Sequence, residues 1–351
     1  MTENPYALPD WNRVAAAPVV RGLLRREIED FRVEELPLIT MDGEGSHLWL
    51  EVEKRNANTD WVARNLATSA GVTSRDIGFA GMKDRRGITT QWFSVALQEA
   101  KDSDWKNWAL PDVTILQAHR HGRKLKRGAL RGNRFRIVVR DLEGPLEGIE
   151  DQFERVAAQG IPNYFGPQRF GHGGRNVAQG ARWLERGGRI QRNKKSIYLS
   201  SIRSFLFNRL LSRRVDLDNW NQIIDGDRAS LDGSHSLFPC KMPDPELVHR
   251  CETFDIHPSG PLPGSGEAQV QGESADIEAD VLAPYADLVA GLSRFGVKAS
   301  RRPLRVVPAN MEWDLAGRDL TLSFELPPGA YATSVLRELV SCDVVTISEN
   351  K

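Results

Sequence analysis

The sequence lacks the residue patterns of a metal enzyme, a disulfide-stabilised protein and a membrane protein. Its three cysteines, Cys240, Cys251 and Cys342, are widely spaced and form no Cys-x-x-Cys pair, which is typical of a reducing compartment. The seven histidines form no His-Glu-x-x-His motif, so we expect no metal ion. Uncharged apolar runs are too short to cross a bilayer, and charged residues and prolines interrupt residues 1–20. These absences predict a cytoplasmic protein without a signal peptide or a membrane partner.

Motifs of several common enzyme classes are missing as well. The glycine-rich segment 171–174 lacks the Lys-Ser/Thr pair of a phosphate-binding loop and the continuation of a dinucleotide-binding turn. The chain contains no Gly-x-Ser-x-Gly motif and no carboxylate cluster of the kind that two-metal nucleases use. The sequence therefore gives no support for a nucleotide hydrolase, a serine hydrolase or a two-metal nuclease.

Charge is balanced overall but unevenly distributed. Lys and Arg number 47, as do Asp and Glu, so the formal net charge is zero. Residues 120–140 nevertheless hold nine basic residues and no acidic one, and a second basic stretch occupies residues 186–195. Acidic residues gather instead at 216–232 and 273–280. Segregation of this kind builds a positive face on a neutral protein, which is the electrostatic footprint of phosphate binding.

The pattern of apolar residues predicts a chain of mixed α and β structure that exceeds one typical domain. Strands are expected near both ends, at residues 47–52, 92–97, 135–140, 305–307 and 320–326. Helices are expected after the possible cap at Asn58 and at residues 149–158, 201–213, 283–295 and 333–339. Residues 233–272 are rich in Pro, Gly and Ser and are expected to form loops. Strands at both ends with helices between them indicate a discontinuous domain that carries an inserted one.

Residues 78–94 place one carboxylate, Asp84, between Lys83 and the pair Arg85 and Arg86, with apolar runs on either side. Cationic neighbours stabilise an ionised carboxylate and lower its pKa, and they also attract a polyanion. An ionised carboxylate within a phosphate-binding surface suits a nucleophile that acts on RNA. Taken alone, however, the segment fits an inert surface turn better.

Two further segments carry candidate site residues. Alternation along a strand would send Asn133 and Phe135 to one face, where an amide could read an unpaired RNA base and a ring could stack on it. Alternatively, Phe135 begins the core face of the strand and Asn133 caps a turn. In residues 21–35, Arg25 or Glu35 could orient a catalytic group, although a solvated, ion-paired strand edge explains these charges better.

Taken together, ordered blocks of this sequence resemble the tRNA pseudouridine synthase D (TruD) family over most of the chain. The first blocks are Gly22-Leu-Leu-Arg25, Glu29-Asp-Phe31, Gly43-Glu-Gly45 with His47, Asn58-Thr59, Phe79-Ala-Gly81, Lys83-Asp-Arg85 and Gln91-Trp92. Residues 120–135 and 161–171 are the most distinctive, and residues 262–267 and 329–339 complete the set. Two positions depart from the pattern, because Arg25 stands where a lysine is expected and residues 85–87 vary after the aspartate. Both departures keep the positive charge.

The resemblance implies an α+β fold. A catalytic domain of the pseudouridine-synthase type, with a mixed, mainly antiparallel sheet and flanking helices, would comprise residues 1–158 and 305–351. A family-specific α/β insertion, the TRUD domain, would comprise residues 159–304. The implied reaction is the isomerisation of uridine 13 in the D arm of tRNA to pseudouridine, without cofactor or metal. We expect the protein to act as a monomer, with tRNA as its partner.

The resemblance also assigns roles to particular residues. Asp84 stands where the family has its catalytic aspartate, Phe135 matches the aromatic residue that stacks on the target base, and Asn133 belongs to the same loop. Supporting charge would come from Arg25, Lys83, Arg85 and Glu35. The RNA backbone would contact the basic residues Arg120, Arg123, Lys124, Lys126, Arg127 and Arg131.

Some alternatives remain open from the sequence. The carboxylate could attack C1′, abstract a proton at C2′, or add to C6 of the base, and each route requires ionised Asp84. Another RNA could be the main substrate, or the chain could be an inactive RNA-binding or chaperone protein. The presence of Asp84, Asn133 and Phe135 together favours the enzyme.

Overall fold

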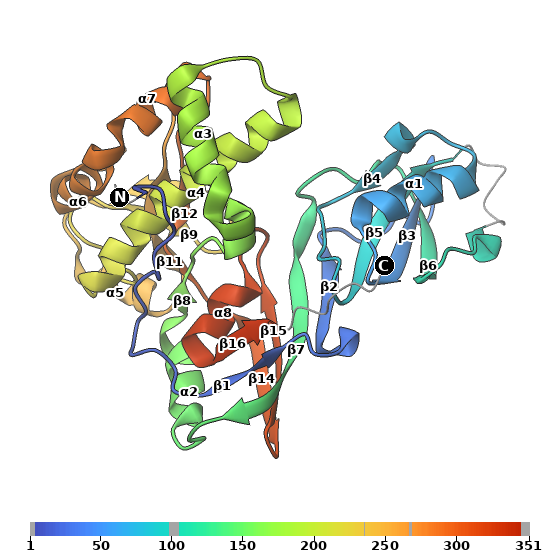
Figure 1. Cartoon of the computed structure of the whole chain (residues 1–351), viewed down its shortest axis with the longest axis horizontal. Helices are drawn as coiled ribbons and strands as arrows, with labels where there is room; N and C mark the ends of the chain where they lie inside the picture. The colour runs from blue at the N-terminus through green and yellow to red at the C-terminus, as the bar shows by residue number, and fades with distance from the viewer. Residues whose placement is uncertain (1–3, 98–104, 235, 267–268, 345–351) are drawn as a thin grey trace. The chain divides into compact units, whose positions relative to one another are not determined.

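The structure is a computed structural model that describes residues 4–97, 105–234, 236–266 and 269–344 (Figure 1). Residue 267, the last of the sequence block 262–267, lies outside these ranges. The chain forms two compact units. Unit 1 comprises Met1–Pro18, Glu147–Val307 and Ala330–Leu339, and unit 2 comprises Val19–Leu146, Pro308–Gly329 and Val340–Lys351.

Unit 2 is built around a mixed, mainly antiparallel sheet (Figure 1). Its strands lie in the order β14-β15-β7-β2-β5-β3-β6, while β1 pairs with β7 and β16, and β4 pairs with β5. The pairings β1–β16 and β2–β5 are parallel. The bounds are β1 Arg21–Leu24, β2 Phe31–Pro37, β3 His47–Arg55, β4 Ile77–Phe79, β5 Ile88–Ala96, β6 Val113–His121, β7 Leu130–Glu143, β14 Ala309–Ala316, β15 Asp319–Leu326 and β16 Ser341–Val344. Helical elements of this unit are η1 Ile28–Asp30, α1 Thr59–Ala70, η2 Ser74–Asp76 and η4 Trp105–Asn107.

The helix α1 covers part of one sheet face in unit 2. It starts after the extended residue Asn58 and ends at Gly71, whose φ of 66° lies in the left-handed region that glycine adopts without strain. Apolar residues at helical spacing, such as Val62 and Leu66, pack on the face formed by β3 and β5. The helix therefore fixes which sheet face is buried at β3 and β5.

Unit 1 is organised around the long helix α4, which packs against α3, α6 and β11 (Figure 1). Its buried side chains, including Ile202, Phe205 and Leu206, belong to the main apolar core of this unit. A small sheet has the order β10-β9-β11-β12, and β8 pairs with β13. The bounds are α2 Ile149–Gln159, β8 Ile161–Pro162, η5 Pro167–Phe170, η6 His172–Gly174, α3 Arg175–Arg186, α4 Arg192–Asp216, β9 Arg228–Leu231, β10 Leu237–Pro239, α5 Pro245–Glu252, β11 Ile256–Leu262, α6 Gly272–Leu282, η7 Ala283–Tyr285, α7 Ala286–Arg294, β12 Ser300–Pro303, β13 Arg305–Val306 and α8 Ala332–Leu339.

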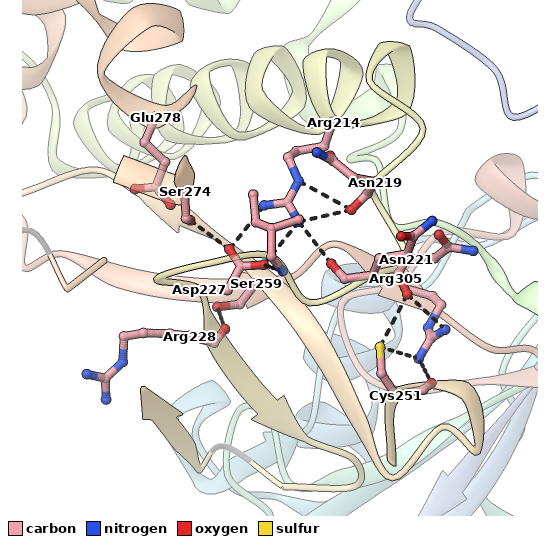
Figure 2. A network of polar contacts seen from close by, with 12 residues as sticks. Arg214, Asn219, Asn221, Asp227, Arg228, Cys251, Ser259, Ser274, Glu278 and Arg305 are labelled. Atoms are coloured by element: carbon pink, nitrogen blue, oxygen red, sulfur yellow. Dashed lines mark hydrogen bonds and ion pairs between the residues drawn. The ribbon is translucent and has the colours of Figure 1, made fainter. Parts of the chain in front are cut away.

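A buried ionic network in unit 1 joins α4 to α6 and to the segment before β9 (Figure 2). Arg214 donates to both carboxylate oxygens of Asp227, at 3.1 and 3.0 Å, and its side chain and that of Asp227 are 2% and 0% exposed. The hydroxyl of Ser274 donates to the same carboxylate at 2.6 Å. Because these charges are out of water, their mutual pairing and hydrogen bonds must offset a large desolvation cost.

The expected α+β class is confirmed, and so are the helices expected at residues 149–158 and 333–339 and the strand at 320–326. The expectation of loops throughout residues 233–272 is wrong, because β10, α5 and β11 lie there. The strand β11 contains Pro258, Gly260 and Pro261 and is buried without alternation. Its strand conformation follows from pairing with β9 and β12, which local sequence does not reveal.

The compact units do not follow the predicted domain boundaries. Residues 147–158 and 330–339 lie in unit 1, since α2 packs against α8 and β8 pairs with β13. The division into residues 1–158 with 305–351 and an insertion at 159–304 thus stays a prediction.

Candidate active site

The loop that carries Asp84 connects β4 to β5 in unit 2, and buried side chains hold its main chain. The amide of Gln91 donates to the carbonyl of Gly81 at 3.3 Å, and the N–H of Lys83 donates to the Thr59 hydroxyl at 3.1 Å. The amine of Lys54 donates to the carbonyl of Asp84 itself at 2.9 Å. The position of Asp84 is therefore set by residues of β3, α1 and β5 rather than by the loop alone.

The carboxylate of Asp84 pairs with Arg25. The Arg25 Nη2 and Asp84 Oδ2 atoms lie 3.1 Å apart, and the Asp84 side chain is 43% exposed. Arg25 follows β1 with a φ of 62°, an uncommon conformation for a residue other than glycine. Its guanidinium lies over the Phe31 ring, 3.8 Å from the centroid, where the ring attracts the cation. The carboxylate thus remains accessible while its cationic partner is held in place.

The other supporting charges expected from the sequence lie near the loop but take different partners. Lys83 forms a buried ion pair with Glu35, with 2.5 Å between Nζ and Oε2. The main-chain N–H of Trp92 donates to the other carboxylate oxygen of Glu35, Oε1, at 3.3 Å. The Nε of Arg85 lies 3.4 Å from the carbonyl of Asn56. Lys83 and Glu35 therefore brace the loop, whereas Arg25 contacts the carboxylate.

Lys54 belongs to the site and was missed by the sequence interpretation. It is fully buried, and its amine also donates to the carbonyl of Ala57 at 2.7 Å. Burial lowers the pKa of Lys54 from its ordinary value to about 8, against the opposing effect of nearby Asp84. One feature of the sequence could have revealed it. Leu50, Val52 and Lys54 alternate along β3, so the lysine lies on the same buried face of the strand as the two apolar residues.

One row of side chains crosses the sheet beneath this loop. Register pairs Phe135 of β7 with Val33 of β2, Val33 with Thr89 of β5, and Thr89 with Lys54 of β3. Residues paired across strands project from the same face, so these four share one face of the sheet. The sequence predicted one face of a single strand, and the register shows that residues of β7, β2, β5 and β3 form this face together.

Phe135 lies in an aromatic cluster on this face. Its ring is stacked on Phe324 with centroids 5.5 Å apart, and the edge contact with Phe31 has centroids 6.4 Å apart. Contacts thus run from Asp84 through Arg25 and Phe31 to Phe135. The residue is 7% exposed, so its ring also serves the core of this unit, as the alternative interpretation of the sequence held.

Asn133 lies on the same strand and is paired in register with Glu35. Its Oδ1 is buried without a hydrogen-bond partner among the described residues, and the same holds for the Nε of Arg25 and the hydroxyl of Thr89. Buried polar atoms of native proteins usually have partners, so orphaned ones call for an explanation such as a ligand. Three of the unpartnered atoms of the described residues lie beside the Asp84 loop and its supporting face, where they leave hydrogen-bonding capacity unused.

The basic residues expected to bind RNA divide into two groups. Arg120 donates to the carbonyls of Gly45 and Leu97, both at 3.1 Å, and so fastens the start of β3. Arg131 lies 3.8 Å from Glu325. The cations of the second group, Arg123, Lys124, Lys126 and Arg127, lie between β6 and β7, and all but Lys124 are exposed. This second group offers positive charge to solvent.

The part of the chain that the structure describes has neither a cluster of metal-ligating side chains nor a membrane-spanning helix. No group of three or more His, Cys, Asp or Glu side chains gathers there in a way that could hold a metal ion. None of the helices described has the length and apolar character needed to cross a bilayer. The side chains of the candidate site are an accessible carboxylate, a cation held against a ring, and buried polar atoms without partners among the described residues. The chain is thus an α+β protein with an accessible, ion-paired carboxylate in unit 2.

Comparisons with known proteins identify the family. The family model described as tRNA pseudouridine synthase D (TruD) matches residues 12–179 and 177–339. The chain is 48% identical to tRNA pseudouridine synthase D of Nitrosococcus oceani over 92% of this chain and 91% of that protein. It is 44% identical to tRNA pseudouridine synthase D of Methylococcus capsulatus, over 98% of both chains. A crystal structure from Methanosarcina mazei, described as a candidate TruD, superposes with a TM-score of 0.71 at 24% identity, covering 94% of this chain and 95% of that one.

The chain belongs to the tRNA pseudouridine synthase D family, and its activity is that of a pseudouridine synthase, an isomerase.

Proposed function

We propose that this protein isomerises uridine 13 in the D arm of tRNA to pseudouridine in the cytoplasm, with Asp84 as the catalytic residue and without a cofactor. The observation that carries the proposal is the Asp84 carboxylate, which is accessible and pairs with Arg25 at 3.1 Å. Lys54 holds the residue in place by donating to the main-chain carbonyl of Asp84. The names of the relatives support tRNA as the substrate.

The reaction needs few groups from the protein. The N1–C1′ bond breaks, the uracil turns, C5 bonds to C1′, and the proton on C5 is lost while N1 regains one. Ionised Asp84 starts this sequence at C1′, at the C2′ proton or at C6 of the base. Arg25 orients the carboxylate by pairing with its Oδ2, whereas Lys54 binds the main-chain carbonyl and takes up neither carboxylate oxygen.

The target base has to leave the RNA stack before Asp84 can reach it. We propose that Asn133 hydrogen-bonds to the flipped uracil, which gives a partner to its buried Oδ1. Phe135 supports the base from the same face, with Phe31 and Phe324 fixing its ring.

The decisive experiment compares wild-type protein with Asp84→Asn on a tRNA transcript, with pseudouridine mapped by position. We expect single-turnover formation to fall at least about a thousandfold in the variant, since the amide cannot act as a nucleophile or base. RNA affinity should change little, because phosphate contacts supply most of it.

Asp141→Asn is the matched control. Asp141 is another half-exposed carboxylate of unit 2 and pairs with Arg26, so its loss should leave turnover close to wild type. A wild-type rate in Asp84→Asn would remove Asp84 from the chemistry. Product at another position in a transcript that carries cytidine at position 13 would show that the target uridine is different.

A further inference from the structure

A groove of about 660 Å³ opens on unit 2 beside the β4 strand, apart from the Asp84 carboxylate. Its walls come from α1, from η2 with β4, and from the segment between β6 and β7. The bottom is partly apolar, since Ile77, Phe79 and Leu125 contribute to it. The groove joins the basic segment recognised in the sequence to two elements that the sequence did not connect with RNA.

The charge of this groove is strongly positive. Its cationic lining residues are Arg64, Arg75, Lys124, Lys126 and Arg127, and Asp60 is the one acidic residue among the lining side chains described. Arg64 comes from α1 and Arg75 from η2, so positive charge faces the groove from more than the basic run. A concave surface lined by cations concentrates the potential that attracts a polyanion.

The basic wall is held in place before any ligand binds. The Trp49 indole donates to the carbonyl of Arg123 at 2.8 Å, and the N–H of Leu125 donates to the Ser94 hydroxyl at 2.9 Å. A Cβ at Gly78 would lie 2.4 Å from the carbonyl oxygen of Leu125, so glycine permits this close approach of β4. A wall fixed in this way loses little conformational entropy on binding.

Arg127 offers a flat surface within the groove. Its guanidinium lies over the Phe79 ring, with 4.5 Å from its central carbon to the ring centroid, while Phe79 packs on Phe93 inside the unit. A guanidinium plane supported on one side by a ring can receive an unstacked base on its other side.

The groove is also close to the reacting carboxylate along the chain. The N–H of Gly128 donates to the carbonyl of Ala80 at 2.8 Å, which fastens the basic wall to the start of the Asp84 loop. From Phe79 to Asp84 the extended chain spans at most about 18 Å. An RNA segment that lies in the groove is thus only a few nucleotides from the nucleotide that reacts at Asp84.

We propose that this groove binds the ribose–phosphate chain that flanks the target uridine, with Arg64, Arg75 and Lys126 on phosphates and the Arg127 plane beneath one unstacked base. The inference rests on the proposed action on RNA and adds Arg64 and Arg75 to the RNA-binding surface. It assigns two kinds of contact, which can be separated by mutation.

The first test measures the salt dependence of tRNA binding for Arg64→Gln/Arg75→Gln. We expect the slope of log affinity against log salt to fall by about two, because two phosphate contacts are lost. An unchanged slope would overturn the assignment of the groove.

The second test uses Arg127→Lys, which keeps the charge and removes the plane. Its salt slope should match wild type, while affinity for oligouridylate should fall about tenfold because a stacking contact is lost. Equal affinity would remove the stacked base from the proposal.

Controls separate these outcomes from a general charge effect. Arg213→Gln/Arg250→Gln removes two arginines of unit 1 that pair with Asp216 and Asp255, and the salt slope should stay unchanged. Poly-uridylate should displace tRNA from wild-type protein at lower concentration than polyglutamate, and equal displacement would contradict an RNA site. If wild type forms no pseudouridine, the proposed function fails, whereas the groove is still judged by the binding slopes.

Discussion

Two buried polar regions of this protein differ in how completely their atoms are partnered. In unit 1, Arg214 donates from all its side-chain nitrogens, and both oxygens of Asp227 accept hydrogen bonds (Figure 2). In unit 2, buried atoms of Arg25, Thr89 and Asn133 near the Asp84 loop have no partner among the described residues. The Arg214–Asp227 pair is fully partnered, even though Asn219 Oδ1 beside it is not, whereas the atoms near the Asp84 loop keep unused hydrogen-bonding capacity.

The difference separates buried polar side chains that stabilise the fold from buried polar side chains that remain available to a ligand. A satisfied buried ion pair is needed by the fold, because removing one partner leaves the other charge uncompensated. Unsatisfied polar atoms weaken the fold slightly and persist where a substrate completes them. Mutations in the two regions should therefore change stability in opposite directions.

The largest effect on stability is expected for Asp227→Asn. The change leaves the buried Arg214 without its counter-charge, and we expect the free energy of unfolding to fall by about 3–5 kcal/mol. Urea denaturation followed by tryptophan fluorescence measures it. Asp216→Asn is the control, since Asp216 pairs with Arg213 on the surface of the same helix and should cost at most about 1 kcal/mol. Similar costs for both variants would show that burial of the pair does not matter.

A smaller effect, which depends on pH, is expected from Lys54. The unfolded chain keeps its proton on this amine up to about pH 10.5, whereas the folded chain releases it near pH 8. Between these values the unfolded state binds more protons, so the free energy of unfolding rises with pH. From pH 7.5 to 9.5 we expect wild type to gain about 1–2 kcal/mol relative to Lys54→Met. Parallel pH profiles would contradict the lowered pKa of Lys54.

The smallest effect has the opposite sign. Thr89→Val removes a buried hydroxyl without a partner and keeps the shape of the side chain, so the free energy of unfolding should rise by about 1 kcal/mol. Turnover should fall if the substrate uses this hydroxyl. Thr59→Val is the control, because the Thr59 hydroxyl bonds Gln91 and the N–H of Lys83, and its loss should destabilise the protein. A loss of stability in both variants would show that Thr89 is already satisfied.

The site could be predicted in part from the sequence. Asp84 could be predicted as the candidate catalytic residue because its cationic neighbours and the ordered blocks around it are local patterns. The identity of the contacting cation could not be recognised in the same way. Lys83 is adjacent in sequence but pairs with Glu35, whereas Arg25, 59 residues away, reaches the carboxylate. A neighbour in sequence can point its side chain to the other side of a loop, so contact depends on register and burial.

The sequence by itself determined the family and the α+β class and made Asp84 the candidate catalytic residue, because motifs and apolar periodicity are written in consecutive residues. The tertiary structure alone decided that Lys54 holds the Asp84 main chain, that Phe135 lies between Phe31 and Phe324, and that Arg64 and Arg75 join the basic groove. These facts depend on strand register and on the packing of α1 beside the sheet. Both bring together residues that are far apart in the chain, and no local pattern encodes such distances.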